Sequence, residues 1–388
     1  MVLPSPLAAS RARPRLPLLS SLPAGDLADL LVAAGGTPSQ ARSAAAKAIA
    51  YALGGRRPSR SRAEGQEWLT PRWDAEVFAE LGIGAWAHPA LSGLDAAASL
   101  DLFERAPSED GTERLVLRCR DGSVVETVII PGPARTTVCI SSQVGCARAC
   151  TFCETGNLGL SRQLDAGEIV DQVRVASVVW GSRAPAISNV VFMGMGEPFD
   201  NLTEVSRAAS VLTDERGLGL SRSRITVSTV GVADRLEAFF RTCPAELAIS
   251  LNAPDDARRS AIMPINKRFP LEALLGELKA HKPRSKIVLF EYVLIAGFND
   301  AEADADLLAA LVEGVRCRVN VIPVNPGPDP AIRTPSPDAV DRFVARLASH
   351  DVVTLVRRPR GRAVGGACGQ LVSQLRIPQA GSATLPRA

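Results

Sequence analysis

The chain after residue 135 is dominated by one repeated pattern, in which a short apolar strand is followed by a loop and an amphipathic helix. Strands rich in Val and Ile that alternate with helices are typical of a parallel sheet covered by helices. The candidate strands cover residues 137–142, 189–193, 224–228, 246–250, 287–295 and 318–323, with a further short strand at 352–356. The candidate helices lie near residues 165–180, 201–213, 232–241, 270–281, 301–313 and 336–349. Because a closed barrel of this kind needs about eight units, the six-unit pattern predicts an α/β fold with an open, partial (β/α) barrel.

The segments around this pattern divide the 388 residues into further regions. Residues 1–25 hold five Pro and three Arg but no acid, and they predict a disordered leader. Residues 26–95 show helical spacing and predict a small helical accessory domain, whereas 110–131 predict an antiparallel β-hairpin around the turn Asp121-Gly122. The barrel is assigned to residues 132–350, a C-terminal strand and mobile loop to 351–378, and a loose tail to 379–388.

Composition limits the class of protein. Apolar residues make up 46% of the chain, so it can bury a large core, and no run of about 18 apolar residues predicts a membrane-spanning helix. The net charge of +3 does not by itself indicate a partner. The leader lacks a convincing secretory cleavage site, so we expect a cytoplasmic protein. Clustered thiols in that compartment are more often metal ligands or redox groups than structural disulfides.

Four of the eight cysteines lie within fifteen residues, and three of these, Cys146, Cys150 and Cys153, form a CxxxCxxC pattern. Three thiolates at this spacing can hold three irons of a 4Fe-4S cluster and leave the fourth iron open to a substrate such as S-adenosylmethionine (SAM). A structural zinc site would need a fourth Cys or His ligand, and none of the three histidines is near. Unliganded thiols are the other alternative. No motif surrounds Cys119, Cys243 or Cys317, which we expect to be bystanders.

Several further motifs occur in a characteristic order. They are Cys139-Ile-Ser-Ser-Gln-Val-Gly-Cys146, Gly194-Met-Gly-Glu-Pro198, Ser250-Leu-Asn-Ala-Pro254, Met263-Pro-Ile-Asn-Lys267, Glu291-Tyr-Val-Leu294, Ile322-Pro-Val-Asn325 and Ala367-Cys-Gly-Gln-Leu371. With these motifs, residues 110–375 resemble the RlmN/Cfr family of radical-SAM enzymes, which methylate a ring carbon of adenosine in 23S rRNA. The resemblance implies a 4Fe-4S cluster on the three cysteines and two SAM molecules per turnover.

The resemblance also implies roles for residues outside the cluster. One SAM would methylate Cys368, and a second, bound to the cluster, would be cleaved to a radical that activates this methyl group for addition to adenine, most readily at C2. Cys139 would resolve the protein–RNA adduct through a transient disulfide with Cys368, and Glu126 matches the proton acceptor of the family. By the residues alone, Cys139 could be a small buried residue and Glu126 a solvent-facing carboxylate on a strand.

Polar residues and glycines follow several of the predicted strands, at the edge where barrel enzymes bind their substrates. Glycine permits close approach of the backbone to a ligand, and a carboxylate can accept hydrogen bonds from the amino group of SAM. The residues that we expect to bind SAM are Gly196, Glu197, Ser228, Ser250, Leu251, Asn252 and Asn325. A turn or helix cap is the alternative role for each of them.

Arginines cluster immediately before Cys368, where they could contact RNA phosphates. The candidates are Arg357, Arg358, Arg360 and Arg362, with a second group at Arg56, Arg57, Arg60 and Arg62. A solvated surface loop is the alternative. The expected partners are 23S rRNA, with tRNA as a further candidate, and an electron donor such as flavodoxin or ferredoxin. The protein is expected to be a monomer.

The chain departs from the family pattern near the expected site. Gly361-Arg362-Ala363-Val364 stands where the family has an acidic stretch, Asn252 replaces a His, and Glu154 replaces a small residue. These departures leave open which RNA is modified, and whether at C2 or C8 of the base. A radical-SAM activase or peptide-modifying enzyme would explain the cluster but not Cys139 and Cys368. A zinc-dependent RNA-binding module would not need the SAM-type motifs.

Overall fold

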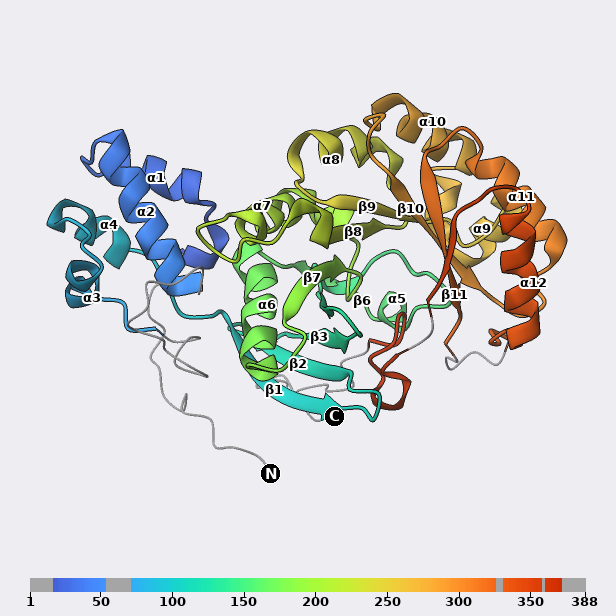
Figure 1. Cartoon of the computed structure of the whole chain (residues 1–388), viewed down its shortest axis with the longest axis horizontal. Helices are drawn as coiled ribbons and strands as arrows, with labels where there is room; N and C mark the ends of the chain where they lie inside the picture. The colour runs from blue at the N-terminus through green and yellow to red at the C-terminus, as the bar shows by residue number, and fades with distance from the viewer. Residues whose placement is uncertain (1–16, 54–70, 326–330, 358–359, 372–388) are drawn as a thin grey trace, which may run out of the picture.

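The computed structural model describes residues 17–53, 71–325, 331–357 and 360–371, and a ten-stranded sheet forms its centre (Figure 1). The strand order is β1-β2-β3-β4-β7-β8-β9-β10-β11-β12. The antiparallel part contains β1 (Leu100–Pro107), β2 (Glu113–Cys119) and β3 (Val124–Pro131). The parallel part contains β4 (Thr136–Cys139), β7 (Ile187–Phe192), β8 (Ile225–Thr229), β9 (Glu246–Ser250), β10 (Val288–Leu294), β11 (Cys317–Pro323) and β12 (Thr354–Val356). Because β4 pairs antiparallel with β3 and parallel with β7, it joins the two parts.

The predicted strands and the α/β class are therefore confirmed, with boundaries that differ by a few residues. The predicted hairpin is the pair β2 and β3, but β1 adds a third antiparallel strand that the sequence did not indicate. Most of β1 is exposed, including Leu102 and Phe103, so its residues lack the alternation of a half-buried strand. A separate two-stranded sheet, β5 (Gln143–Cys146) with β6 (Gly159–Gln163), was also missed.

Six helices follow the parallel strands and lie along the outside of the sheet (Figure 1). They are α6 (Ala166–Trp180), α7 (Leu202–Thr213), α8 (Leu236–Thr242), α10 (Leu271–His281), α11 (Glu302–Val312) and α12 (Pro337–Ala348), as the helical spacing predicts. Helix α6 begins at a reciprocal cap, in which the Asp165 and Glu168 side chains each accept from the other residue's backbone N–H. The short helices α5 (Glu154–Asn157) and α9 (Asp256–Ile262) were not predicted.

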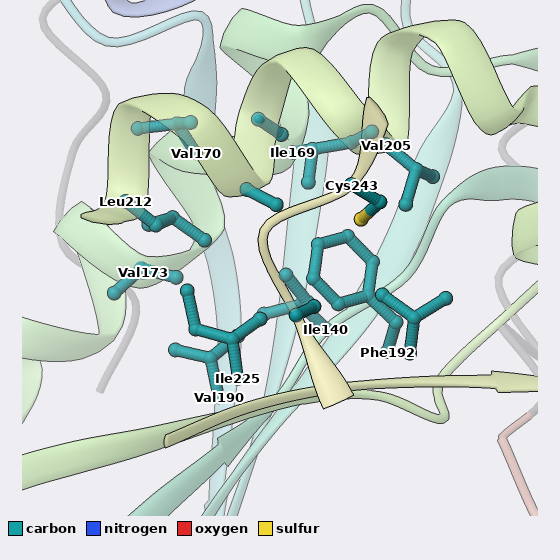
Figure 2. Close-up of a cluster of buried hydrophobic side chains, with 14 of the residues drawn as sticks. Ile140, Ile169, Val170, Val173, Val190, Phe192, Val205, Leu212, Ile225 and Cys243 are labelled. Atoms are coloured by element: carbon teal, nitrogen blue, oxygen red, sulfur yellow. The ribbon is translucent and has the colours of Figure 1, made fainter. Parts of the chain in front are cut away.

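The largest core lies between the sheet and these helices. Figure 2 shows Ile169 and Val170 of α6 and Val205 of α7 directed toward Val190 and Phe192 of β7. These side chains are almost completely buried. Removal of this apolar area from water, worth about 25 cal/mol per Å², is the main force that holds the helices on the sheet.

The N-terminal helices α1 (Ala24–Ala33), α2 (Pro38–Leu53), α3 (Ala75–Glu80) and α4 (His88–Ser92) form a separate group beside α6 and α7 (Figure 1). The predicted disordered leader is wrong for residues 17–25. Leu19 is completely buried in a 3-10 turn against α6, and Ser20 Oγ donates to Asp171 Oδ2 at 3.2 Å. Leu18 and Leu19 supply the buried apolar contacts that hold this segment in place. Within the described ranges, no helix is both long and apolar enough to cross a membrane.

Candidate active site

Two adjoining cavities are lined by the parallel strands, the first at their carboxyl ends and the second extending further toward their amino ends. We call them the cluster-side cavity, which Cys146, Cys150 and Cys153 line, and the cysteine-side cavity, which Cys139 and Arg357 line. Both cavities are also lined by the same five residues, namely Met193, Glu291, Ile322, Asn325 and Cys368. The two groups of cysteines that the sequence singled out therefore lie on either side of a common wall.

The three clustered cysteines come from the end of β5 and the loop before α5. Burial raises the pKa of the Cys146 thiol to about 12 and that of Cys150 higher still, so both thiols are protonated without a metal. Metal binding would displace these protons. Among the described residues, no three His, Cys, Asp or Glu side chains are grouped to hold a single metal ion. The fit to a cluster with three protein ligands rests on the donor type and on the shared cavity.

Gly196 and Glu197 form the cavity wall after β7. Gly196 has φ +102°, and a Cβ there would lie 2.6 Å from Gln143 Cβ, so only glycine fits. The Glu197 N–H donates to Gln143 Oε1 at 2.7 Å. Its carboxylate accepts from the Phe199 and Val230 N–H groups at 2.9 Å, and burial raises its pKa to about 7. Glu197 can thus present a carboxyl group to a ligand, although two of its acceptor positions are used within the fold.

The other residues predicted to bind SAM fall into two groups. Ser228, Ser250, Asn252 and Asn325 line the cluster-side cavity together with Gly196 and Glu197. Leu251 does not line it: its side chain is fully buried, and its backbone N–H and C=O are bonded to Glu291 O and Arg259 Nε. The structure therefore brings together every predicted SAM-binding residue except Leu251.

Arg259 of α9 organises the rim of the cluster-side cavity and was missed by the sequence analysis. Its guanidinium is fully buried and donates to the carbonyl oxygens of Val230, Ser250 and Leu251 at 2.7, 3.0 and 3.0 Å. Burial lowers its pKa to about 10. Because these carbonyls end β8 and β9, Arg259 ties the two strand ends together. Helix α9, which carries it, was too short to predict from spacing.

The cysteine-side cavity places a cation beside two thiols. Arg357 follows β12, and its Nη1 donates to Met193 Sδ at 3.4 Å. The interaction with Cys368 raises the pKa of Arg357 most, burial opposes it, and Glu291 and Cys139 raise it further. Burial raises the pKa of the Cys139 thiol to about 12. Cys139 is 4% exposed and belongs to the hydrophobic core, and it also lines this cavity.

Glu291 of β10 and Asn320 of β11 are polar residues inside the sheet that the sequence analysis gave no role. Ser228 Oγ donates to Glu291 Oε2 at 3.2 Å, and Asn320 Nδ2 donates to Oε1 at 3.5 Å. Burial raises the pKa of Glu291, and the nearby Arg357 guanidinium opposes this. A charged residue in the otherwise apolar strand Val288–Leu294 was the signal that could have found it.

Glu126 of β3 lies outside the linings of both cavities. Its side chain is completely buried, and Oε1 accepts from Arg114 Nη1 at 2.8 Å. The alternative of a solvent-facing carboxylate is therefore wrong. The loop before Cys368 covers this region, since Gly366 packs near Arg114 and Val128.

The arginines predicted to contact RNA point in different directions. Arg357 faces the cavity rather than a protein surface, because β12 turns its side chain toward Met193. Arg360 is exposed and donates to Pro131 O, and Arg362 is exposed and bonds to Asn325. Arg358 and the group Arg56, Arg57, Arg60 and Arg62 lie outside the described residues.

Comparison with known proteins adds independent evidence. Residues 140–309 match the model of the radical SAM superfamily. A probable RNA methyltransferase of Sorangium cellulosum is 60% identical, with 92% of this chain and 87% of that protein aligned. The dual-specificity RNA methyltransferase RlmN of Syntrophobacter fumaroxidans is 43% identical over 71% of this chain and 81% of its own length.

A solved structure agrees with these relatives. The crystal structure of a radical SAM methyltransferase from Sphaerobacter thermophilus has a TM-score of 0.76 and 34% identity, and the match covers 91% of this chain and 98% of that one. Radical SAM enzymes of this type carry a 4Fe-4S cluster and use two SAM molecules, which agrees with three thiols on one cavity and a further cysteine shared with a second. The chain therefore belongs to the RlmN/Cfr-type radical-SAM RNA methyltransferases.

Proposed function

We propose that this RNA methyltransferase modifies carbon C2 of an adenosine in 23S rRNA, with tRNA as a second substrate, and that Cys368 carries the methyl group. The observation that carries this proposal is the position of Cys368 on both cavities, opposite the three clustered thiols and beside Cys139. The similar RlmN proteins are named dual-specificity enzymes, which supports two RNA substrates. We further assign six strands, β4, β7, β8, β9, β10 and β11, to a six-unit partial barrel.

The residues of the cluster-side cavity would bind the cofactor. Cys146, Cys150 and Cys153 would hold the cluster, and Glu197, Ser228 and Asn325 would orient SAM. When bound, the cluster and SAM supply the one-electron chemistry that activates the methyl group on Cys368. An electron donor such as flavodoxin or ferredoxin would deliver the electron.

The residues of the cysteine-side cavity would complete the transfer. The Cys368 sulfur attacks the methyl group of one SAM, and S-adenosylhomocysteine leaves. Once the activated methyl carbon is joined to the base, the adduct would give up one electron, returned to the cluster, and the ring proton. The Cys139 thiolate would then attack the Cys368 sulfur, so that an S–S bond forms while the electron pair of the breaking C–S bond stays on the carbon, which takes up a proton to become the methyl group. Glu126, buried and paired with Arg114, would accept the proton that the ring carbon loses. Reduction of the disulfide by an external dithiol restores both cysteines.

The test is methyl transfer by a Cys368→Ala variant. We expect the unaltered protein, reconstituted anaerobically, to methylate adenosine C2 in fragments of 23S rRNA, as measured by mass mapping of RNA digests. Transfer by Cys368→Ala is expected to fall to background while its iron content stays unchanged, because Cys368 is not a cluster ligand. Cys317→Ala is the matched control, since Cys317 lies outside both cavities. Full transfer by Cys368→Ala, or a methyl group at another ring position, would contradict the proposal.

A further inference from the structure

Asn325, which was expected to bind SAM, has its side-chain amide engaged by the loop that carries Cys368. Its Nδ2 donates to the Cys368 carbonyl oxygen at 3.0 Å. Its Oδ1 accepts from Arg362 Nε at 2.7 Å. Asn325 lies two residues after the end of β11, and it is bonded to two residues of the loop that follows β12.

Arg362 is one of the departures from the family pattern, where an acidic stretch is usual. An acidic side chain could not donate to Asn325 Oδ1, whereas a guanidinium is a donor only. With Oδ1 fixed by Arg362, the other end of the planar amide must present Nδ2 toward Cys368. Arg362 Nη2 also approaches Val324 O at 3.5 Å. The arginine therefore determines which way the amide faces.

The same loop is bonded to the segment that follows the third clustered cysteine. The Glu154 N–H donates to Gly369 O at 2.8 Å, and Thr155 Oγ1 donates to Leu371 O at 2.7 Å. On its other side, the Gly361 N–H donates to Asp110 Oδ2 at 2.9 Å. The backbone of the loop is thus held on both flanks of Cys368, and Asn325, which Arg362 contacts, is bonded to Cys368 itself.

We propose that Arg362 is a positioning residue for Cys368: through Asn325 it latches the cysteine loop over the two cavities and sets how often the thiol becomes accessible. This inference rests on the proposed role of Cys368 as methyl carrier. With both ends of the Asn325 amide bonded to this loop, the loop stays closed over the cavities, and release of these two bonds frees Cys368.

The test is the rate at which iodoacetamide alkylates Cys368 in the full-length chain at one fixed pH, followed by mass spectrometry of the Cys368 peptide. Loss of one hydrogen bond shifts an opening equilibrium by roughly three- to tenfold. We expect Arg362→Ala and Asn325→Ala each to raise the rate by about that factor. Arg362→Lys, which lacks the guanidinium fork, should restore part of the protection. The control Arg268→Ala removes an exposed ion pair to Asp234 and should leave the rate unchanged.

A double variant separates the latch from general loosening. If Arg362 acts through Asn325, Arg362→Ala adds nothing to Asn325→Ala, whereas independent contacts would multiply their effects. Alkylation of the buried Cys243 reports global unfolding and should stay slow in all variants. An unchanged rate in Arg362→Ala, multiplied effects in the double variant, or equal acceleration at Cys243 would each overturn the inference. None of these readouts depends on RNA methylation, so failure here is distinct from failure of the proposed function.

Discussion

The two cavities share a wall but differ in their charged groups. On the cluster side, three thiols face a buried carboxyl group, Glu197, and Arg148 is paired with Asp200. On the cysteine side, Arg357 lies beside Cys139 and Cys368, and its guanidinium contacts a thioether. A site for a metal cluster needs thiolates, whereas a pair of redox thiols benefits from a nearby cation. The difference teaches that one sheet presents two unlike sets of charged groups to two cavities, both of which Cys368 lines.

The largest expected effect is loss of iron from the cluster-side cavity, which would distinguish it from the cysteine-side cavity. Cys150→Ala removes one of the three thiolates, so we expect iron binding to fall from about four atoms per chain to nearly none. Iron and sulfide analysis after anaerobic reconstitution measures this change. Cys243→Ala is the matched control, because this buried thiol lies outside both cavities, and it should keep its iron. Full iron content in Cys150→Ala would break the comparison between the two sides.

An intermediate effect on stability is expected at Glu291, one of the five residues that line both cavities. Burial raises the pKa of Glu291, so its folded carboxyl keeps a proton to higher pH than the unfolded one. The stability from the protonated form is then present below the unfolded pKa of about 4.5 and is lost as the pH rises through the folded pKa. Glu291→Gln cannot ionise. We therefore expect its urea midpoint, relative to the unaltered protein, to be higher at pH 8 than at pH 5.

The control for this pH dependence is Glu237→Gln. Glu237 is an exposed carboxylate on α8, 3.9 Å from Arg241, and its replacement should give the same midpoint difference at both pH values. If Glu291→Gln showed no greater difference at pH 8 than at pH 5, the pKa of Glu291 would not be raised by burial in the folded protein.

The smallest expected effect on stability comes from the hydrogen bond between Ser228 and the Glu291 carboxyl group. Ser228→Ala removes the 3.2 Å hydrogen bond to Glu291, so we expect a loss of about 0.5–1.5 kcal/mol in the free energy of unfolding. Urea denaturation measures it. Ser221→Ala, which removes an exposed contact with Ser223, should cost less. Equal losses in the two variants would show that Ser228 does not help to fix the wall.

Much of the candidate site could be predicted because its signals are local in the sequence. The spacing of Cys146, Cys150 and Cys153 and the polar residues after the strands required only the knowledge that parallel strands end at one edge. Leu251 was misplaced because in a strand end only alternate side chains reach the cavity. Arg357 was predicted as one of four arginines that contact RNA, but an arginine cluster in sequence does not reveal which member faces a cavity.

Features that depend on distant contacts were not predictable in the same way. Strand β1 is held by pairing with β2 and not by its own pattern, and residues 17–25 are ordered because Leu19 packs on α6. Arg259 carries no local motif that would reveal three bonds to strand-end carbonyls. Glu126 combines both cases. Its strand was predicted from the local pattern, but its burial involves Arg114 and the loop before Cys368, which are distant contacts.

The sequence by itself determined the alternation of strands and helices and the CxxxCxxC motif, because each depends on residues close together along the chain. Only the tertiary structure decided that Cys139 and Cys368 share a cavity, that Glu291 lines both cavities, and that Arg362 is bonded to Asn325. These contacts join residues that are tens to hundreds of positions apart. Their geometry is fixed by the pairing of the strands and the packing of the core, which no local pattern encodes.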